Sequence, residues 1–277
     1  MNYFERAKYF RTKKRLGQNF LIDGEVIADI INYANISDND TVLEIGPGVG
    51  FVTEQLVKHA KKVIAVELDE EAIKELKKLN APNLEIIHND ILKTDLSTLC
   101  EGDIKVVANI PYYITSPIIA HLLGEVDDLN NKNRAKITDI ILMVQEEVAR
   151  RMCANENSQG KQYGLLTILS QFWANVEILR IVGRKCFYPA PKVTSALVKL
   201  DVRKEPLLKL SDYSHFRKTI RAGFAQRRKN IKNCLLHGGF PKEKVLNALS
   251  KLGIDENTRG EKLSIETFGK LSEELIK

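Results

Sequence analysis

Short apolar runs alternate with stretches of helical periodicity through most of the chain. Runs of this kind form strands that are buried on both faces, and the periodic stretches between them predict helices that cover a sheet. We predict seven strands, at residues 41–45, 62–67, 84–88, 104–108, 137–144, 176–182 and 193–202. The last run alternates apolar and polar positions, as an edge or antiparallel strand does. The pattern therefore predicts an α/β fold built on a seven-stranded, largely parallel sheet.

The last quarter of the chain has helical periodicity only. Strand alternation ends before the segment RKEPLLKL, residues 203–210, in which Pro206 interrupts the pattern. We therefore predict two domains: residues 1–203, which begin with a basic segment at residues 1–15, and a small helical domain at residues 204–277.

One part of this helical tail combines an apolar stripe with a cationic flank. Residues 213–242 contain no acidic side chain. The stripe consists of Phe216, Ile220, Phe224, Ile231 and Leu235. The flank consists of Arg217, Lys218, Arg221, Arg227, Arg228, Lys229 and Lys232. This arrangement predicts one face packed against protein and one cationic face.

The net charge of +6 is unevenly distributed. Residues 204–277 carry 16 basic and 9 acidic side chains, and residues 1–15 carry six basic groups against Glu5. Residues 16–203 carry 20 basic and 26 acidic side chains. Two basic ends around an acidic middle favour a nucleic acid gripped by the terminal segments, although solvated basic faces are the common alternative. The candidate contacts are Arg221, Arg227, Arg228, Lys229 and Lys232.

Composition excludes several classes of protein. The 277 residues, 44% of them hydrophobic, can bury a full core. No stretch approaches the roughly 18 to 20 apolar residues that a membrane span needs, and residues 1–15 lack the apolar centre of a secretory signal, so we expect a cytoplasmic protein with no membrane partner. Cysteines stand far apart, without metal-ligand spacing, at Cys100, Cys153, Cys186 and Cys234. We expect buried, reduced thiols and no metal site.

A glycine-rich turn follows the first predicted strand, in the segment VLEIGPGVGF at residues 42–51. A dinucleotide fingerprint would place its third glycine where Phe51 stands, which counts against a nicotinamide cofactor. Glu44 would repel a pyrophosphate but would suit a ligand with a sulfonium and an amino group. The pattern therefore favours S-adenosylmethionine over NAD, and a turn without a ligand is the alternative.

Acidic residues end the next two strands. Glu67 closes the apolar run 62–67 and stands 21 residues after Gly46, where an acid can accept from both ribose hydroxyls. Asp90 follows the run 84–88, and its carboxylate could accept from an adenine amino group. A helix cap is the alternative for either acid, but Asp69 is the better candidate for capping the helix after Glu67.

The fourth strand runs into the segment NIPYY at residues 109–113. An amino group on a base is a poor nucleophile because its lone pair is delocalised into the ring. Acceptors such as the Asn109 side-chain oxygen and the Ile110 carbonyl would favour a pyramidal nitrogen. Pro111 stiffens the turn, and Tyr112 offers a face on which a flipped base can stack. The alternative is a proline turn with two packed tyrosines.

A second aromatic candidate lies in the proline-held segment CFYPAP, residues 186–191. Phe187 is presented there outside any regular periodicity. It could form the second wall of a base pocket opposite Tyr112, and a cap on the core is the alternative.

Together, LGQNFL (residues 16–21), EIGPGVG, Glu67, Asp90, NIPYY and FYPAPKVTS resemble the KsgA-type adenine N6-dimethyltransferases of small-subunit ribosomal RNA. The resemblance spans nearly the whole chain. It implies a Rossmann-like seven-stranded methyltransferase domain that depends on S-adenosylmethionine, followed by a small C-terminal helical domain. It also implies methyl transfer to N6 of two adjacent adenosines in the 3′-terminal hairpin of 16S rRNA during ribosome biogenesis, by a monomer acting on a partly assembled 30S subunit.

The resemblance also implies roles for particular residues. The methyl donor would contact or lie near Gln18, Asn19, Leu21, Gly46, Glu67, Asp90, Ile91 and Asn109. The catalytic set would be Asn109, Ile110, Pro111, Tyr112 and Phe187, of which the two aromatic residues would sandwich the adenine.

Three other functions stay open. A sister family that methylates large-subunit (23S) rRNA and confers antibiotic resistance shares the glycine turn, the N-I-P motif and the proline segment. LGQNFL and the tail RAGFAQRRKNIKN favour the small-subunit type. A non-catalytic RNA-binding assembly factor is disfavoured by the intact NIPY, and DNA adenine methylation is the nearest alternative by chemistry.

Overall fold

The computed structural model describes residues 2–13, 16–160 and 162–277, including the main chain but not the side chain of Tyr112. The chain forms two compact units. The first, here the sheet unit, comprises Met1–Leu122, Asn131–Ala149 and Asn175–Val202. The second, here the helical unit, comprises Leu123–Asn130, Arg150–Ala174 and Arg203–Lys277.

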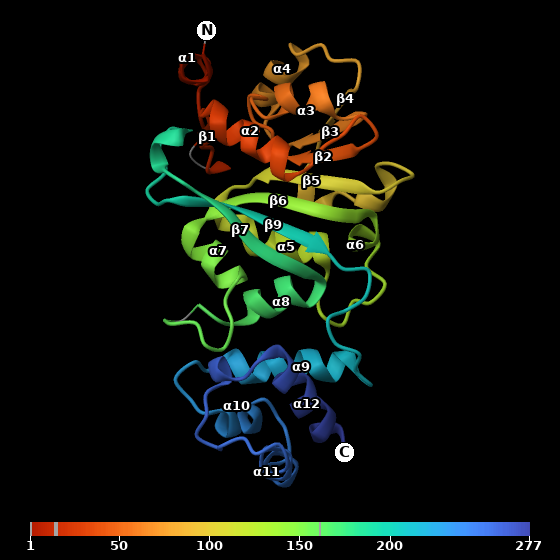
Figure 1. Ribbon diagram of the computed structural model, residues 1–277, viewed down its shortest axis with the longest axis vertical. Helices are drawn as coiled ribbons and strands as arrows, with labels where there is room; N and C mark the ends of the chain where they lie inside the picture. The colour runs from red at the N-terminus through yellow and green to blue at the C-terminus, as the bar shows by residue number, and fades with distance from the viewer. Residues whose placement is uncertain (1, 14–15, 161) are drawn as a thin grey trace. The chain divides into compact units, whose positions relative to one another are not determined.

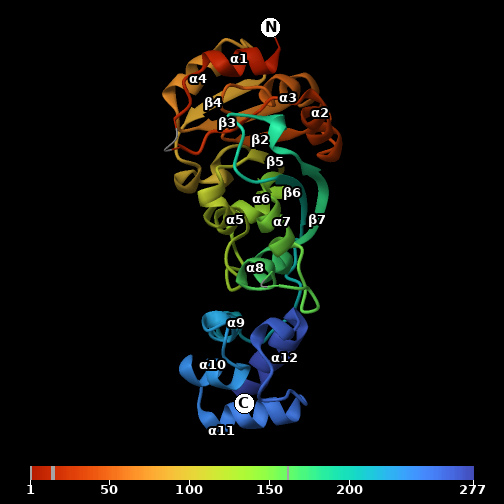
Figure 2. The ribbon, with the colours of Figure 1, turned by 90° about the vertical axis from the view of Figure 1, so that its left-hand side faces the viewer.

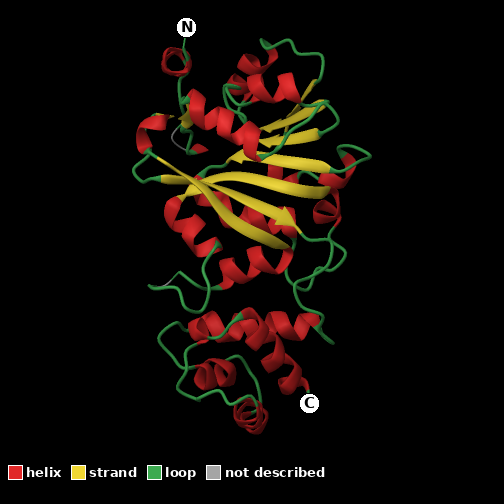
Figure 3. Ribbon diagram, viewed as in Figure 1, coloured by secondary structure: helices red, strands yellow, loops and turns green. Residues whose placement is uncertain are grey.

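A seven-stranded sheet with the order β4-β3-β2-β5-β6-β9-β7 is the framework of the sheet unit (Figures 1 and 3). Its strands are β2 (Thr41–Ile45), β3 (Lys62–Glu67), β4 (Leu84–His88), β5 (Ile104–Asn109), β6 (Ile137–Gln145), β7 (Ala174–Val182) and β9 (Ser195–Val202). The pairs from β4 through β6 are parallel, and β9 runs antiparallel to β6. All seven predicted strands are confirmed, with boundaries shifted by up to two residues. Of the two options for the last strand, edge or antiparallel, the antiparallel one is confirmed, since β9 lies between β6 and β7.

The strand order reverses at β2, which pairs with β3 on one side and β5 on the other. Connections that leave β2 and β5 therefore run to opposite faces of the sheet, and a crevice forms between them at the carboxyl ends of the strands. The glycine turn follows β2 and the NIPYY segment follows β5. The two edge strands, β4 and β7, are both seen in Figure 2.

Several helices of the sheet unit begin at a short polar side chain that caps them. Asp23 caps α2 by accepting from Glu25 N and Val26 N. Asp69 caps α4 by accepting from Glu71 N, so the cap predicted at Asp69 is confirmed. Its helices are α1 (Tyr3–Tyr9), α2 (Gly24–Tyr33), α3 (Thr53–His59), α4 (Glu70–Lys77), α5 (Thr115–Leu123), α6 (Lys132–Lys136) and α7 (Glu146–Met152). Short 3-10 turns are η2 (Ile91–Lys93), η3 (Leu96–Thr98), η4 (Tyr112–Ile114) and η5 (Arg184–Cys186).

Two elements have no periodic signal in the sequence. Helix α1 lies within the basic segment and starts at a capping box in which Asn2 and Glu5 bond each other's backbone amides. Strand β1 (Phe20–Leu21) pairs antiparallel with β8 (Phe187–Tyr188), so LGQNFL and the proline-held segment meet in a two-stranded ribbon. Runs of two residues are too short to show a period of two.

The helical unit is larger than the predicted tail. It contains α8 (Leu165–Trp173), α9 (Tyr213–Ala225), α10 (Ile231–His237), α11 (Lys242–Lys251), η6 (Gly260–Lys262) and α12 (Ile265–Ile276). In Figure 3 the chain after β9 consists of helices and loops. The predicted division at residue 203 differs from the compact units because residues 123–130 and 150–174 pack with α9. Phe172 contacts the Phe216 ring, and Arg217 pairs with Glu125.

The four cysteines are free thiols. The expectation that all are buried is wrong: Cys234 is buried, and Cys100, Cys153 and Cys186 are half-exposed. Among the described residues, no helix has the length and apolar character to cross a bilayer. In the same part of the chain, no group of three or more histidine, cysteine, aspartate or glutamate side chains is placed to hold a metal ion.

Candidate active site

A pocket opens at the carboxyl ends of β2, β3 and β5, in the crevice that the strand order creates. It gathers all eight predicted donor-binding residues, Gln18, Asn19, Leu21, Gly46, Glu67, Asp90, Ile91 and Asn109. The catalytic candidates Ile110 and Pro111 also line it. These residues come from five separate segments of the sequence, so the fold brings together most of the predicted site.

The three glycines of the turn have positive φ and meet different surroundings. A Cβ on Gly48 would lie 2.7 Å from Phe20 Cε1, and one on Gly50 would lie 2.9 Å from Leu76 Cδ2. A Cβ on Gly46, by contrast, would have no atom within 4 Å, although Gly46 also lines the pocket. Gly48 and Gly50 therefore serve packing, whereas the room beside Gly46 suits the close approach of a ligand to the backbone.

Glu44 lies in β2 rather than in the turn and is 3% exposed. Thr53 Oγ1 donates to Glu44 Oε2 over 2.6 Å. Burial raises the pKa of Glu44 to about 8, so the carboxyl is largely protonated at pH 7. Without a ligand, Glu44 therefore offers little charge to attract a sulfonium, because the fold withholds the water that would stabilise that charge, and its role beside a bound ligand stays a prediction.

Glu67 closes β3, and its carboxylate is held by backbone amides. Oε1 accepts from Leu68 N and Asp69 N, both over 2.8 Å, and Oε2 accepts from Gly48 N over 2.9 Å. Burial raises the pKa of Glu67, and these three amides act in the opposite direction. A carboxylate has about four acceptor sites, so about one remains for a ribose hydroxyl rather than the two expected from the sequence.

Asp90 and Ile91 form the next stretch of the pocket wall. Asp90 caps η2 by accepting from Leu92 N over 3.0 Å, and its own backbone amide donates to Asn89 Oδ1 over 2.9 Å. Asp90 therefore caps a turn and also lines the pocket, and its contact with an adenine amino group stays a prediction.

Asn109 has an orientation that its surroundings determine. Its Nδ2 donates to the Asn19 carbonyl over 3.1 Å. Only the amide nitrogen can donate a hydrogen bond, so the bond to the Asn19 carbonyl shows which end of the side chain is Nδ2. Oδ1 is the other end. Among the described residues, Oδ1 receives no hydrogen bond. The side chain thus keeps its acceptor available at the wall of the pocket.

The rest of NIPYY lies partly in the pocket wall. Ile110 is buried, Pro111 is half-buried, and η4 starts directly after Pro111. The side chain of Tyr112 is outside the described residues, so its predicted stacking role stays a prediction. Tyr113 lines the pocket and is 62% exposed. The sequence predicts no role for it, because chemistry alone does not separate two adjacent tyrosines.

Phe187 is the predicted catalytic residue that the described structure does not bring to the pocket wall. It is 2% exposed, belongs to the hydrophobic core of the sheet unit and lies opposite Leu21 in the β1–β8 ribbon. Leu21 does line the pocket, so Phe187 lies one residue behind the wall. Its stacking role stays a prediction.

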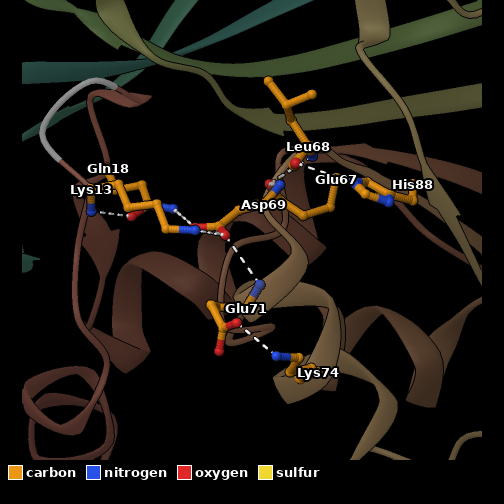
Figure 4. Close-up of polar contacts among 8 residues, drawn as sticks. All are labelled: Lys13, Gln18, Glu67, Leu68, Asp69, Glu71, Lys74 and His88. Carbon is orange, nitrogen blue, oxygen red and sulfur yellow. Dashed lines mark hydrogen bonds and ion pairs between the residues drawn. The ribbon is translucent and has the colours of Figure 1, made fainter.

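The segment LGQNFL closes one side of the pocket, and polar contacts tie it to the start of α4 (Figure 4). Gln18 Nε2 donates to Asp69 Oδ2 over 2.8 Å, while Gln18 Oε1 accepts from Lys13 N over 2.7 Å. Lys13 Nζ also bonds Asp69 Oδ1. Both ends of the Gln18 amide are therefore used within the protein. The sequence offers no signal for this cluster, since its members are up to 56 residues apart.

The model of the ribosomal RNA adenine dimethylase family matches residues 9–277. The chain belongs to that family. Ribosomal RNA small subunit methyltransferase A of Clostridium botulinum (strain Loch Maree / Type A3) is 46% identical over 270 residues, which are 95% of this chain and 94% of the relative. The predicted resemblance and the predicted enzyme class, an rRNA adenine dimethyltransferase, are confirmed.

Two solved structures of the same fold are similar along most of their length. A dimethyladenosine transferase from Plasmodium falciparum is 31% identical, with a TM-score of 0.73, over 90% of this chain and 94% of that one. The 23S rRNA methyltransferase ErmE is 30% identical, with a TM-score of 0.70, over 94% of this chain and 100% of that one. The predicted methyltransferase fold is confirmed, and membership of a methyltransferase family implies S-adenosylmethionine as the methyl donor.

The candidate RNA contacts of the family member lie in the helical unit and differ in their surroundings. Arg221 pairs with Glu125 over 2.9 Å and Lys232 with Glu256 over 2.5 Å. Helix α9 ends at Ala225, so Arg227, Arg228 and Lys229 lie in the turn before α10 and not on a helix face. All three are exposed, and among the described residues Arg228 and Lys229 have no ion-pair partner.

Proposed function

We propose that this dimethylase transfers methyl groups from S-adenosylmethionine to N6 of two adjacent adenosines in the 3′-terminal hairpin of small-subunit rRNA. One observation carries the proposal: Asn109 sits in the wall of a pocket that contains all eight candidate donor contacts, with its amide nitrogen engaged and its oxygen available. Such an arrangement suits the holding of an amino group beside a methyl donor.

The residues of the pocket fit the donor. Gly46 leaves room for close approach, Glu67 keeps about one acceptor site at Oε2 for a ribose hydroxyl, and Asp90 can accept from an adenine amino group. Leu68, which follows Glu67, is exposed in the pocket and offers an apolar surface to a purine ring. When bound, the donor supplies an electrophilic methyl group.

The chain's own contribution is to hold the acceptor nitrogen. Asn109 Oδ1 and the Ile110 carbonyl accept hydrogen bonds from the N6 amino group, and these bonds strengthen as that nitrogen becomes tetrahedral. Interactions that strengthen in the transition state accelerate the reaction, whereas those that bind both states equally do not. Tyr112 and Phe187 are proposed to hold the flipped adenine between two aromatic faces.

The choice of small-subunit rRNA rests on the relatives. A relative that is 46% identical is named a small-subunit enzyme, whereas the large-subunit enzyme ErmE is 30% identical. An action during ribosome biogenesis would place the protein in the cytoplasm, where it is proposed to work as a monomer on a partly assembled 30S subunit.

Mapping of methylated adenines in cells with and without the protein tests the substrate. We expect two adjacent dimethyladenosines of small-subunit rRNA to lose their methyl groups, and re-expression of the protein to restore them. Loss of methylation in 23S rRNA or in DNA would overturn the assignment, and unchanged methylation everywhere would favour the non-catalytic assembly factor.

We further propose that the cationic turn at Arg227, Arg228 and Lys229 holds the RNA backbone and does not take part in the chemistry. If each cation neutralises a phosphate, replacing all three with alanine should flatten the salt dependence of RNA binding by roughly 2 to 3 units of log slope. A matched triple change at Lys242, Lys244 and Lys251 removes equal charge from α11 and should have less effect. An unchanged slope would place the RNA contact elsewhere, first in the basic segment at residues 1–15.

A further inference from the structure

Asp69 is a buried carboxylate with more partners than a helix cap needs. Its side chain is 0% exposed, and it accepts from Glu71 N over 3.1 Å as the cap of α4. A cap uses a single side-chain acceptor. Two further donors, Lys13 Nζ and Gln18 Nε2, come from the segment before β1 (Figure 4). Burial tends to raise the pKa of Asp69, but the bonds from Lys13 and Gln18 outweigh it and hold this pKa below its usual value.

Asp69 is also joined to the donor-binding wall. Its backbone amide donates to Glu67 Oε1 over 2.8 Å, so a shift of Asp69 would disturb the carboxylate that holds the glycine turn through Gly48 N. Leu68, between these two acids, is 52% exposed and lines the pocket. The same three-residue turn therefore faces the pocket on one side and the N-terminal segment on the other.

The N-terminal segment crosses from this wall to the wall formed by NIPYY. Leu16, Gly17, Gln18 and Asn19 all line the pocket. At the far end, the Asn19 carbonyl accepts from Asn109 Nδ2. Gly17 packs so closely there that a Cβ on it would lie 3.3 Å from Tyr113 Cε1 and 3.5 Å from Pro111 Cβ. Residues 16–19 thus span the pocket between two anchor points.

We propose that Lys13, Gln18 and Asp69 form a latch that holds residues 16–19 across the methyl-donor pocket. Asp69 and Lys13 are positioning residues in this inference, which rests on the proposed function: they set the affinity and residence time of the donor, and do not contact the acceptor nitrogen. Breaking the latch would free residues 16–19, here the strap, at one end while Asn109 still holds the other. Because the acceptor wall keeps its groups, turnover at saturating donor should change little.

Lys13→Met tests the latch, since it removes the charge and keeps the length of the side chain. We expect the dissociation constant for S-adenosylmethionine, measured by calorimetry without RNA, to rise about tenfold, the scale of one charge-assisted hydrogen bond. The KM for the donor should rise in parallel while kcat stays within about twofold, and Lys13→Arg should recover most of the affinity. Backbone amides of residues 16–19 should exchange hydrogen faster in Lys13→Met without any ligand.

Lys74→Met is the matched control, because Lys74 pairs with Glu71 over 2.7 Å on the same helix and makes no contact with the strap. Asp69→Asn gives a second test, since asparagine caps helices as well as aspartate and so preserves the start of α4. Combining it with Lys13→Met should weaken donor binding by less than the product of the two single effects.

The outcomes separate the latch from the function. If wild type binds S-adenosylmethionine and Lys13→Met binds it as tightly as Lys74→Met does, the latch is overturned and the proposed function stands. If wild type does not bind S-adenosylmethionine, the proposed function itself fails, and the latch fails with it. A fall in kcat with unchanged donor affinity would also overturn the latch, since it would assign Lys13 to the chemistry.

Discussion

The pocket has a donor wall at Glu67–Asp69 and an acceptor wall formed by the NIPYY segment, and the two are built in opposite ways. On the donor wall the polar groups are already engaged: Glu67 accepts three backbone amides, and Asp69 accepts from Lys13, Gln18 and Glu71. On the acceptor wall Asn109 keeps its oxygen available, and Tyr113 is largely exposed. Engaged groups have fixed positions, so the donor wall is organised before a ligand arrives.

The difference follows from what each wall must recognise. A small donor is recognised by groups that are held rigidly, because rigid groups lose little entropy on binding. The acceptor is one base of a large RNA, and the groups that act on its nitrogen must be unengaged until that nitrogen arrives. Changes on the acceptor wall should therefore reduce turnover, whereas changes on the donor wall should reduce donor affinity.

Asn109→Ala should have the largest effect. Loss of one hydrogen bond to a group that changes charge and geometry in the transition state costs about a hundred- to a thousandfold in kcat. Donor affinity should fall less, because the Asn109 oxygen would act chiefly on the amino group of the adenine, while its amide nitrogen is engaged with the Asn19 carbonyl. Single-turnover methylation of RNA and donor calorimetry measure the two quantities. A kcat within a factor of a few of wild type would contradict the catalytic role of Asn109.

Glu67→Ala should reduce donor affinity rather than turnover. A ribose hydroxyl loses its acceptor, and an unpaired buried donor costs about 1 to 3 kcal/mol, so donor affinity should fall about ten- to a hundredfold. Three backbone amides also lose their acceptor, which lowers the stability of the fold. Glu67→Gln keeps one acceptor oxygen and should lie between alanine and wild type. Calorimetry with S-adenosylmethionine and with NAD checks the effect. A donor affinity equal to that of wild type would remove Glu67 from the binding wall.

Substitutions at Phe187 test whether this residue belongs to the acceptor wall. Phe187→Ala would open a cavity in the core and cost about 3 to 5 kcal/mol of stability, so it cannot isolate stacking. Phe187→Leu keeps most of the buried volume and removes the aromatic face. If Phe187 stacks on the adenine, Phe187→Leu should raise the KM for RNA about tenfold with a small change in melting temperature. An unchanged KM would leave Phe187 as a core residue only.

The sheet and most of the pocket could be predicted from the sequence because each depends on local signals. Buried strands appear as apolar runs, and ligands of doubly wound sheets lie at strand ends, so Gly46, Glu67, Asp90 and Asn109 are found by position. The two-stranded ribbon and helix α1 could not be predicted from the sequence, since each is stabilised by contacts with distant segments. Tyr3, for example, packs its ring 4.8 Å from that of Phe51.

The charge and the hydrogen-bond partners of each polar group could not be predicted from the sequence either. Glu44 looks like an available carboxylate, yet the fold buries it against Thr53. Glu67 looks like a free acid, yet its carboxylate accepts hydrogen bonds from three backbone amides. Asp69 was expected to cap a helix, which it does, but its bond to Lys13 bridges 56 residues. Residue type and spacing locate a group, whereas its charge and partners depend on tertiary packing.

The smallest expected effect concerns Glu44, whose buried carboxyl should make the stability of the protein depend on pH. Its folded pKa of about 8 exceeds the ordinary value of 4.5, so the folded chain holds a proton that the unfolded chain has lost between these values. Stability therefore falls as pH rises through this window, and the fall ends above pH 8. Between pH 7 and pH 9 the wild type should lose about 1 kcal/mol more than Glu44→Gln, which has no proton to release. Denaturant unfolding at the two pH values measures the difference, with exposed Glu71→Gln as the control that should follow wild type. Equal losses in wild type and Glu44→Gln would show that Glu44 is ionised in the folded protein, and would restore it as a charged group of the donor wall.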